Sequence, residues 1–546
     1  MKSKIFALGL FFGALVSPGL SAIWQPAETV SNPAQPISNL GGPVLSVNVQ
    51  GNAIAVWTDN DNPVWPEEKV ISSNFYLRGI GWEGPRIISS LAANQFDKPL
   101  YTGQGDPDVA MNSSNYAVVV WEGEYSEEPN FPQVIISTVR QSNGVWGPVQ
   151  LVSEDSNRLA ATNANVALNE AGTAVAAFRS YDRILNEQYI KVSILTPGGT
   201  WSAPLIISDA EEPTGLTPDS KPYVVINESG DIAVIWYRRY PLNVYGIDVA
   251  TYDAGTATWS PPVHLDTGDS DDFDQNPRVA IDENGNAVAI WNFNGDVKTS
   301  FFTSGTGWGP SQVIGFLADR NPSVVMDPAG NATATWAANF PLGQIYSSFK
   351  PIGGVWTVPE IISNGTDNTQ FPFMSQEPLA VDSEGNVIAV WNAGNGRIDS
   401  AFRLFNQPWQ SPLTVVNEPE QTIYESVGLA SCGFAVALWS NGPGEEARAA
   451  VNENIFPLIV SGNAIFTHCK LQFATQKSYI SSLSWVPFSA ACISAYNIYC
   501  NGRLVATTTD TSVSIQSCRK VPCKFTITTV NVSGIESPPI PFVLRN

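Results

Sequence analysis

The segment GNAIAVW at residues 51–57 decides the fold, because its pattern returns seven more times along the 546-residue chain. Small and apolar residues alternate with a period of two, which is typical of a β-strand with two differently packed faces. A turn residue precedes each run, and a large aromatic residue ends it. The eight aromatic residues are Trp57, Trp121, Phe178, Trp236, Trp291, Trp336, Trp391 and Trp439.

The spacing of this pattern predicts the architecture. Successive aromatic residues are 64, 57, 58, 55, 45, 55 and 48 positions apart, and strand-rich repeats of roughly 50 residues are typical of β-propeller blades. The sixth position before the aromatic residue is glycine in seven copies and Asn115 in the other, which favours a tight turn with positive φ. A strand such as PYVVIN precedes the turn, and a third strand and a Trp-Pro strand follow the aromatic residue. Four strands per unit predict a blade.

The two ends of the repeat region predict how the ring closes. The eighth unit lacks the Trp-Pro strand, and a matching segment, WQPAETVS, begins at Trp24. We expect this segment to pair with the third strand of the last blade, near residues 447–452, and so to remove a free edge. The sequence therefore predicts an all-β chain, with an eight-bladed β-propeller over residues 23–455 followed by a small β-sandwich. Seven blades are the alternative.

The first 22 residues have the features of a signal peptide. Lys2 and Lys4 precede an apolar run over residues 5–16, and small residues follow up to Ala22. The run is too short to span a bilayer comfortably, and no other segment approaches twenty apolar residues. We expect a protein that is secreted or exposed at the cell surface, with no transmembrane segment after cleavage.

The repeat ends at residue 455, and a different pattern follows. Residues 456–546 contain a strand around Trp485, the hairpin strand YNIYCNG and the ending FTITTVNVSGIESPP. These segments resemble a fibronectin type III domain, which implies a β-sandwich that acts as a spacer or adhesion module. Phe525 departs from the family, which usually carries a tyrosine there.

Five of the six cysteines lie in this last part of the chain, and disulfides are stable outside the cytoplasm. Cys492 and Cys500 flank an extended stretch of about eight residues, which places them roughly 25 Å apart, too far to bond. The resemblance to the fibronectin type III arrangement implies a bond between Cys469 and Cys492. It also implies that Cys500 bonds to Cys523 or Cys518.

Charge and composition exclude some functions. The chain has 50 acidic and 28 basic residues, a net charge of −22, which argues against a nucleic-acid partner. Only two histidines are present, which disfavours a histidine-based triad or a multi-histidine metal site. One acidic segment could bind Ca²⁺ outside the cell, although its spacing is not that of a twelve-residue calcium loop and the alternative is a solvated loop. Its acids are Asp266, Asp269, Asp271, Asp272 and Asp274. No other cofactor is expected.

Long loops are expected after the aromatic residues of the first four units, whereas tight glycine turns occupy the opposite face. Aromatic side chains on such loops stack on sugars or anchor protein partners, and the alternative is that they pack their own loops. We therefore expect a monomeric binding or adhesion protein that recognises a glycan or a protein through the loop face. The candidate binding residues are Trp65, Tyr125, Tyr181, Tyr237, Arg238, Arg239, Tyr240 and Tyr245.

The alternative function is that of a carbohydrate-active enzyme, a sialidase-like or other glycosidase or a lyase. Sialidases are propellers with repeated aspartate turns, clustered arginines and a catalytic tyrosine, and this chain has Tyr237, Arg238 and Arg239. However, the sialidase repeat places aspartate two residues before glycine, whereas here it lies three before, and the tryptophan falls six after. The resemblance fails in register, so no catalytic residue is assigned and an enzyme is the less favoured hypothesis.

Overall fold

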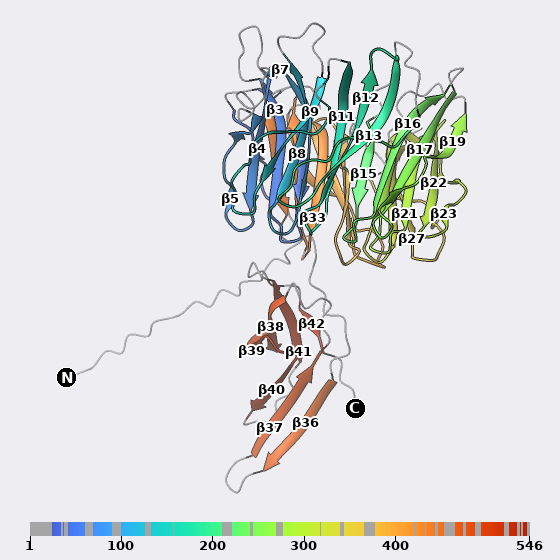
Figure 1. Cartoon of the computed structure of the whole chain (residues 1–546). Coiled ribbons are helices and arrows are strands. Elements are labelled where there is room, and N and C mark those ends of the chain that lie inside the picture. The colour runs from blue at the N-terminus through green and yellow to red at the C-terminus, as the bar shows by residue number, and fades with distance from the viewer. Residues whose placement is uncertain are drawn as a thin grey trace, which may run out of the picture. The chain divides into compact units, whose positions relative to one another are not determined.

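The structure is a computed structural model, and all regular elements among its described residues are β-strands (Figure 1), which confirms the predicted all-β class. No helix in the described part is long and apolar enough to cross a membrane. The described residues are 24–33, 36–37, 42–60, 69–89, 100–125, 133–154, 156, 158–209, 221–240, 244–268, 277–316, 318–338, 343–364, 377–419, 422–431, 433–442, 446–452, 465–472, 477–485, 493–517, 524–531, 536 and 539–542.

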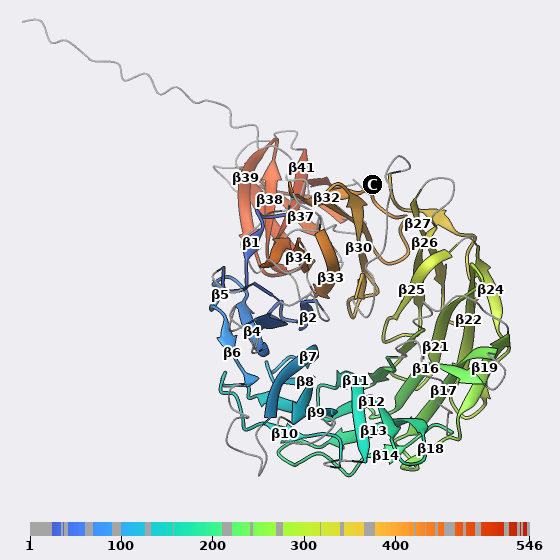
Figure 2. The same ribbon diagram turned by 90° about the horizontal axis from the view of Figure 1, so that it is seen from above.

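The chain divides into two compact units, Trp24–Ile455 and a second that contains Phe456–Asn546. In the first unit the described residues form eight sheets of four or five antiparallel strands. Figure 2 shows these sheets following one another around a centre, with strands such as β2, β7, β11 and β33 innermost. This arrangement is a β-propeller, and we call each sheet a blade, numbered 1 to 8 by the order of its inner strand.

Each blade is a meander that runs outward from its inner strand. The inner strands are β2 (Val44–Val47), β7 (Leu100–Met111), β11 (Leu159–Leu168), β15 (Tyr223–Ile226), β20 (Arg278–Ile281), β25 (Ala318–Met326), β29 (Leu379–Val381) and β33 (Thr422–Ala430). The second strands are β3 (Ala53–Asn60), β8 (Ala117–Tyr125), β12 (Ala174–Asp182), β16 (Ile232–Tyr240), β21 (Ala287–Phe293), β26 (Ala332–Ala338), β30 (Val387–Gly394) and β34 (Phe434–Asn441).

The third and outer strands complete the blades. The third strands are β4 (Lys69–Leu77), β9 (Gln133–Arg140), β13 (Glu187–Leu195), β17 (Val244–Asp253), β22 (Asp296–Thr303), β27 (Gln344–Lys350), β31 (Arg397–Arg403) and β35 (Glu446–Asn452). The outer strands are β1 (Glu28–Thr29), β5 (Gly81–Trp82), β6 (Arg86–Ile87), β10 (Gln150–Leu151), β14 (Leu205–Ile206), β18 (Thr258–Trp259), β19 (Val263–Gly268), β23 (Gly307–Trp308), β24 (Gln312–Gly315), β28 (Glu360–Ile361) and β32 (Leu413–Asn417).

The repeated aromatic residues form the core between blades, as the sequence predicts. All eight are at most 1% exposed, and the small residues before them on the second strands are also buried. Seven glycines and Asn115 in the turns have positive φ, from 63° at Asn115 to 94° at Gly330. Because an L-residue with a bulky side chain rarely adopts this conformation, glycine or asparagine is required at these turns.

Ring closure by the N-terminal segment is confirmed. Glu28 pairs with Ala449 and Thr29 with Arg448, so β1 is the outer strand of the blade formed by β33, β34 and β35. Trp24 is buried, and its indole Nε1 donates a hydrogen bond of 3.0 Å to Ser400 Oγ in the neighbouring blade. A segment more than 400 residues away in sequence therefore covers the edge of blade 8.

The second unit contains two sheets. One holds β36 (Ile465–Gln472), β37 (Lys477–Ser484) and β40 (Ser512–Ser517). The other holds β39 (Arg503–Thr508), β38 (Ile493–Cys500), β41 (Phe525–Asn531) and β42 (Ile540–Pro541). Its core includes Trp485, whose ring meets that of Tyr496 edge-on at 5.0 Å between centroids.

The disulfide hypothesis stays a prediction. Cys492, Cys518 and Cys523 lie outside the described residues, as does the side chain of Cys469. Cys500 ends β38 opposite Phe525 in β41, so the chain just before Phe525 approaches Cys500, as the proposed bond to Cys523 requires.

Candidate functional site at the mouth of the central channel

The inner strands enclose a cavity of about 400 Å³. Residues from β2, β7, β11, β15, β25, β29 and β33 line it, so seven of the eight blades contribute. The tight turns close one end of these strands. The other end, where the inner strands begin, is also where the second strands end and where the long loops leave the blades. We call this end the mouth.

Eight equivalent positions form a ring at the mouth. Each lies four residues before the asparagine, aspartate or alanine that begins the tight turn, and in seven blades it pairs with the residue preceding the repeated aromatic. The residues at these positions differ from blade to blade, and we call them the mouth ring. They are Val44, Asp108, Asn165, Tyr223, Arg278, Ser323, Pro378 and Ser426.

A β-bulge or similar irregularity shapes the mouth in four blades. The pairing of β7, β11, β25 and β33 with their second strands shifts just before Asp108, Asn165, Ser323 and Ser426. In β7, β11 and β33 the backbone two residues earlier has positive φ, at Asp106, Asn163 and Tyr424. Bulges re-aim side chains and are common beside functional sites, and here they set the direction of the following mouth-ring residues.

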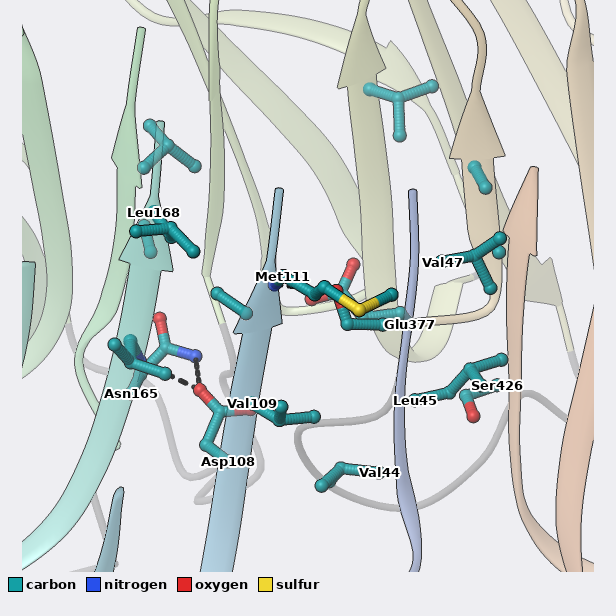
Figure 3. Close-up of a pocket in the computed structure, with 18 of the residues that line it drawn as sticks. Val44, Leu45, Val47, Asp108, Val109, Met111, Asn165, Leu168, Glu377 and Ser426 are labelled. Carbon is teal, nitrogen blue, oxygen red and sulfur yellow. Dashed lines mark hydrogen bonds between the residues drawn. The ribbon is translucent and has the colours of Figure 1, made fainter. Parts of the chain in front are cut away.

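Asp108 is fixed between blades 2 and 3. Its Oδ2 accepts hydrogen bonds from Asn165 Nδ2 at 2.6 Å and from the Val166 amide at 2.8 Å (Figure 3). Asn165 in turn accepts a 2.7 Å bond from the Val224 amide of blade 4. Burial raises the pKa of Asp108, while the positive charge of Lys221 and these hydrogen bonds oppose the rise.

A hydrogen bond between Tyr223 and Glu377 connects blades 4 and 7. The tyrosine hydroxyl donates to Glu377 Oε1 at 2.6 Å, and both residues line the cavity. Burial raises the pKa of Glu377 and, together with the nearby carboxylate, raises that of Tyr223 well above 10. The tyrosine therefore stays neutral and acts as a hydrogen-bond donor across the physiological pH range.

Arg278 completes the polar part of the mouth. Its guanidinium lies over the Tyr223 ring, 4.6 Å from the ring centroid, a distance at which a cation–π interaction is attractive. Its positive charge opposes the rise in the pKa of Glu377. Two carboxyl groups, an amide and a phenol thus line the cavity together with valine, leucine and methionine side chains, and the guanidinium stacks on the phenol ring from outside the lining.

The structure corrects part of the predicted site. Tyr237 and Tyr245 do not lie on an exposed loop; they are 3% and 5% exposed, belong to β16 and β17, and stack on each other at 5.4 Å between centroids. The reason is that β16 continues past Trp236 to Tyr240 and β17 begins at Val244, so only residues 241–243 connect them. Both tyrosines pack in the core between blades 4 and 5.

The other predicted binding residues are dispersed or not described. Tyr181 lies in β12, and its hydroxyl donates to Asn186 Oδ1 at 3.0 Å. Arg238 Nη1 donates to Asp209 at 3.1 Å and to the fully buried Asp248 at 3.2 Å, so this arginine braces blade 4. Outside the described residues or side chains lie Trp65, Tyr125, Arg239 and Tyr240.

The proposed calcium segment is described only at its start. Asp266 Oδ2 accepts hydrogen bonds from Trp291 Nε1 at 2.9 Å and Lys298 Nζ at 2.8 Å, so this carboxylate already has two donors. Asp269, Asp271, Asp272 and Asp274 lie outside the described residues. In the part that the structure describes, no group of three or more His, Cys, Asp or Glu residues could hold a metal ion.

Several solved structures are similar to this chain at a low level. No family model and no curated protein matches the sequence. A lectin, BP39L from Burkholderia pseudomallei, aligns with a TM-score of 0.42 at 11% identity over 69% of this chain and 100% of its own. The Hadza microbial sialidase Hz136 aligns with a TM-score of 0.38 at 11% identity, over 72% of this chain and 74% of its own.

A third similar structure is the alpha-L-arabinanase of Penicillium chrysogenum. It aligns with a TM-score of 0.35 at 14% identity, over 63% of this chain and 92% of its own. Similarity at this level transfers neither ligand nor reaction.

Proposed function

We propose that this protein binds a glycan at the mouth of its central channel. The observation that carries the proposal is the group of Asp108, Asn165, Tyr223 and Glu377 around a cavity of about 400 Å³. Small-ligand sites typically have volumes of roughly 300–1,000 Å³ and a few converging polar groups on an apolar lining. Sugar hydroxyls both donate and accept hydrogen bonds, so carboxyl, amide and phenol groups together suit them.

The rigidity of these groups supports a binding role. Asp108 and Asn165 are held by backbone amides of the next blade, and Tyr223 and Glu377 hold each other. Side chains that are already ordered lose little conformational entropy when a ligand binds. The proposal also includes export, since glycans are abundant outside the cell and the first 22 residues resemble a signal peptide.

Glycosidic bond hydrolysis is the second candidate, and one observation favours it. Burial raises the pKa of both Asp108 and Glu377, and a carboxyl group with a raised pKa is suited to act as a general acid. Glycosidases generally use two carboxyl groups in one site. A binding protein needs no such proton transfer, so the two candidates differ in whether the bound glycan is shortened.

A glycan array with the full-length protein tests the proposal. We expect binding to a restricted set of glycans, with signal reduced at least tenfold in the variants Glu377→Gln and Tyr223→Phe. The matched control is Tyr346→Phe, since Tyr346 donates to Gln344 at 2.9 Å on the third strand of blade 6, outside the cavity lining. Binding that survives both mouth variants would overturn the proposal, and mass spectrometry of bound glycans would reveal hydrolysis.

A further inference from the structure

Arg278 is a buried cation at the mouth that forms no ion pair with any carboxylate in the described part of the chain. The residue is 8% exposed, and its hydrogen bond is a long one, 3.3 Å from Nη1 to the carbonyl oxygen of Pro277. Among the residues that the structure describes, no carboxylate forms an ion pair with it. A guanidinium carries five N–H donors in a planar fork, so most donors of Arg278 have no protein acceptor in the described part of the chain.

Other arginines of the propeller show the contrast. Arg158 pairs with Asp182, and Arg448 pairs with Glu418 at 2.8 Å. Arg238 pairs with two aspartates. These three arginines are paired with carboxylates. Arg140 and Arg403 are, like Arg278, buried without an ion pair among the described residues, but they lie on third strands, whereas Arg278 lies on an inner strand at the mouth. The Glu377 carboxyl lies near enough to interact with the charge of Arg278 but forms no ion pair with it, so a ligand oxyanion would supply acceptors that the guanidinium lacks.

We infer that the glycan bound at the mouth carries an anionic group, a carboxylate, sulfate or phosphate, that pairs with Arg278. This inference rests on the proposed function and names the class of sugar. Arginine binds such oxyanions through two parallel hydrogen bonds, which fixes their orientation as well as adding affinity. The stacking of the guanidinium on Tyr223 holds the fork in place beside the cavity.

The charges around the cavity fit a ligand with two kinds of group. Among the described residues at the mouth, Asp108 and Glu377 are acidic, and Arg278 and Lys221 are basic. The carboxyl groups of Asp108 and Glu377 can form hydrogen bonds with the hydroxyls of the sugar ring, while Arg278 pairs with the acidic substituent of the sugar. A neutral sugar would leave the guanidinium donors unpaired, and a simple anion would leave the carboxyl groups without hydroxyl partners.

The test is an array printed with matched oligosaccharides that differ only at the terminal residue: glucose, glucuronic acid, glucose 6-sulfate or glucose 6-phosphate, with galactose and galacturonic acid as a second series. We expect the full-length protein to prefer an anionic member at least tenfold over its neutral counterpart, and the member preferred identifies the anion. In Arg278→Gln the preference should fall to about twofold or less. Arg278→Lys, which keeps the charge but not the fork, should retain part of it.

The control variant is Arg158→Gln, which removes the same charge from an exposed arginine of blade 3. It should leave the preference unchanged. Equal binding of neutral and anionic members by the wild-type protein, or a preference that survives in Arg278→Gln, would overturn this inference and leave the proposed function standing. Binding to none of the glycans on the broader array would instead contradict the proposed function. If Arg278→Gln does not fold, Arg278→Lys is the deciding variant. A preference for anionic glycans lower than that of the wild type would support the inference, and an unchanged preference would contradict it.

Discussion

The two ends of the inner strands differ in how strongly their residues repeat from one blade to the next. At the turn end, Asn48, Asn112, Asn169 and Asn227 each accept amide hydrogen bonds within their own turn and donate to a carbonyl of the next blade. At the mouth, four residues earlier, the mouth ring carries a different side chain in nearly every blade.

This difference distinguishes the residues that hold the propeller together from the residues that can form a binding site. A residue that repeats from blade to blade serves a role that every blade shares, and here that role is to join neighbouring turns. A residue that varies at an equivalent position is free of that role. The mouth ring can therefore hold the chemistry of a site while the turns hold the ring together. The following predictions test this separation, from the largest expected effect to the smallest.

Deletion of residues 24–31 should have the largest effect. It removes the buried Trp24 and Val30 and exposes the edge of β35, so the free energy of unfolding should fall by about 5 kcal/mol or more. Urea unfolding of the full chain and the deletion variant measures it. An unchanged midpoint would mean that the ring does not depend on its closure.

Tyr237→Ala should destabilise the propeller by about 3–5 kcal/mol, because its side chain packs against Tyr245 in the core. The matched substitution Tyr181→Ala, at a partly exposed position, should cost less than about 1 kcal/mol. Thermal unfolding of both variants distinguishes them. If Tyr237→Ala left stability intact and removed glycan binding, the original loop assignment would be right after all.

Gly385→Ala, a substitution at the turn end, should lower the free energy of unfolding by roughly 1–3 kcal/mol. Gly385 has φ of +81°, and an added Cβ would lie 2.7 Å from Asp327 Oδ2 and 2.8 Å from the ring of Phe405. Gly353→Ala is the control, because its φ is +66° but nothing lies within 4 Å of the added atom. Urea midpoints should fall further for Gly385→Ala; equal shifts would show that crowding at the turn contributes nothing.

Asp382→Asn should change the pH dependence of stability. Burial raises the pKa of Asp382 to about 6, above the usual aspartate value of 3.8. The protonated form is thus favoured in the folded state, so its contribution to stability is complete below about pH 3.8 and is lost as the pH rises through about 6.

Removal of the titrating group should therefore stabilise the variant relative to wild type as the pH rises from 4.5 to 7.5. Urea midpoints at the two pH values measure this difference. A difference of opposite sign would show that the ionised carboxylate, which accepts the Glu384 and Asn386 amides, is the favoured form in the turn.

The sequence allowed the fold to be predicted better than the site. The alternating strands, the positive-φ turns and the closure by Trp24 follow from local patterns, since each recurs with the same spacing. Tyr237 was assigned wrongly because the second strand of blade 4, like those of the other blades, continues past the repeated aromatic residue. The sequence gives no local indication that the strand continues, because tyrosine and arginine also occur in loops.

The mouth was missed for a different reason. Its signal was present, because the second letter of PDVAMN, PYVVIN and PRVAID varies while the rest of the motif repeats. That variation shows that this residue does not serve a role common to all blades. It does not show which of these side chains lie close together. Tyr223 and Glu377 are 154 residues apart, and only the closed ring brings the phenol and the carboxyl group together.

The most direct test of the separation is to measure both binding and stability in one variant from each end. Isothermal titration calorimetry with the best array glycan gives Kd, and urea unfolding gives stability, for Glu377→Gln and Gly385→Ala. We predict that Glu377→Gln raises Kd at least tenfold with an unchanged midpoint. Gly385→Ala should lower the midpoint with an unchanged Kd. A raised Kd in Gly385→Ala together with an unchanged Kd in Glu377→Gln would place the ligand at the turn end and contradict the assignment of the mouth.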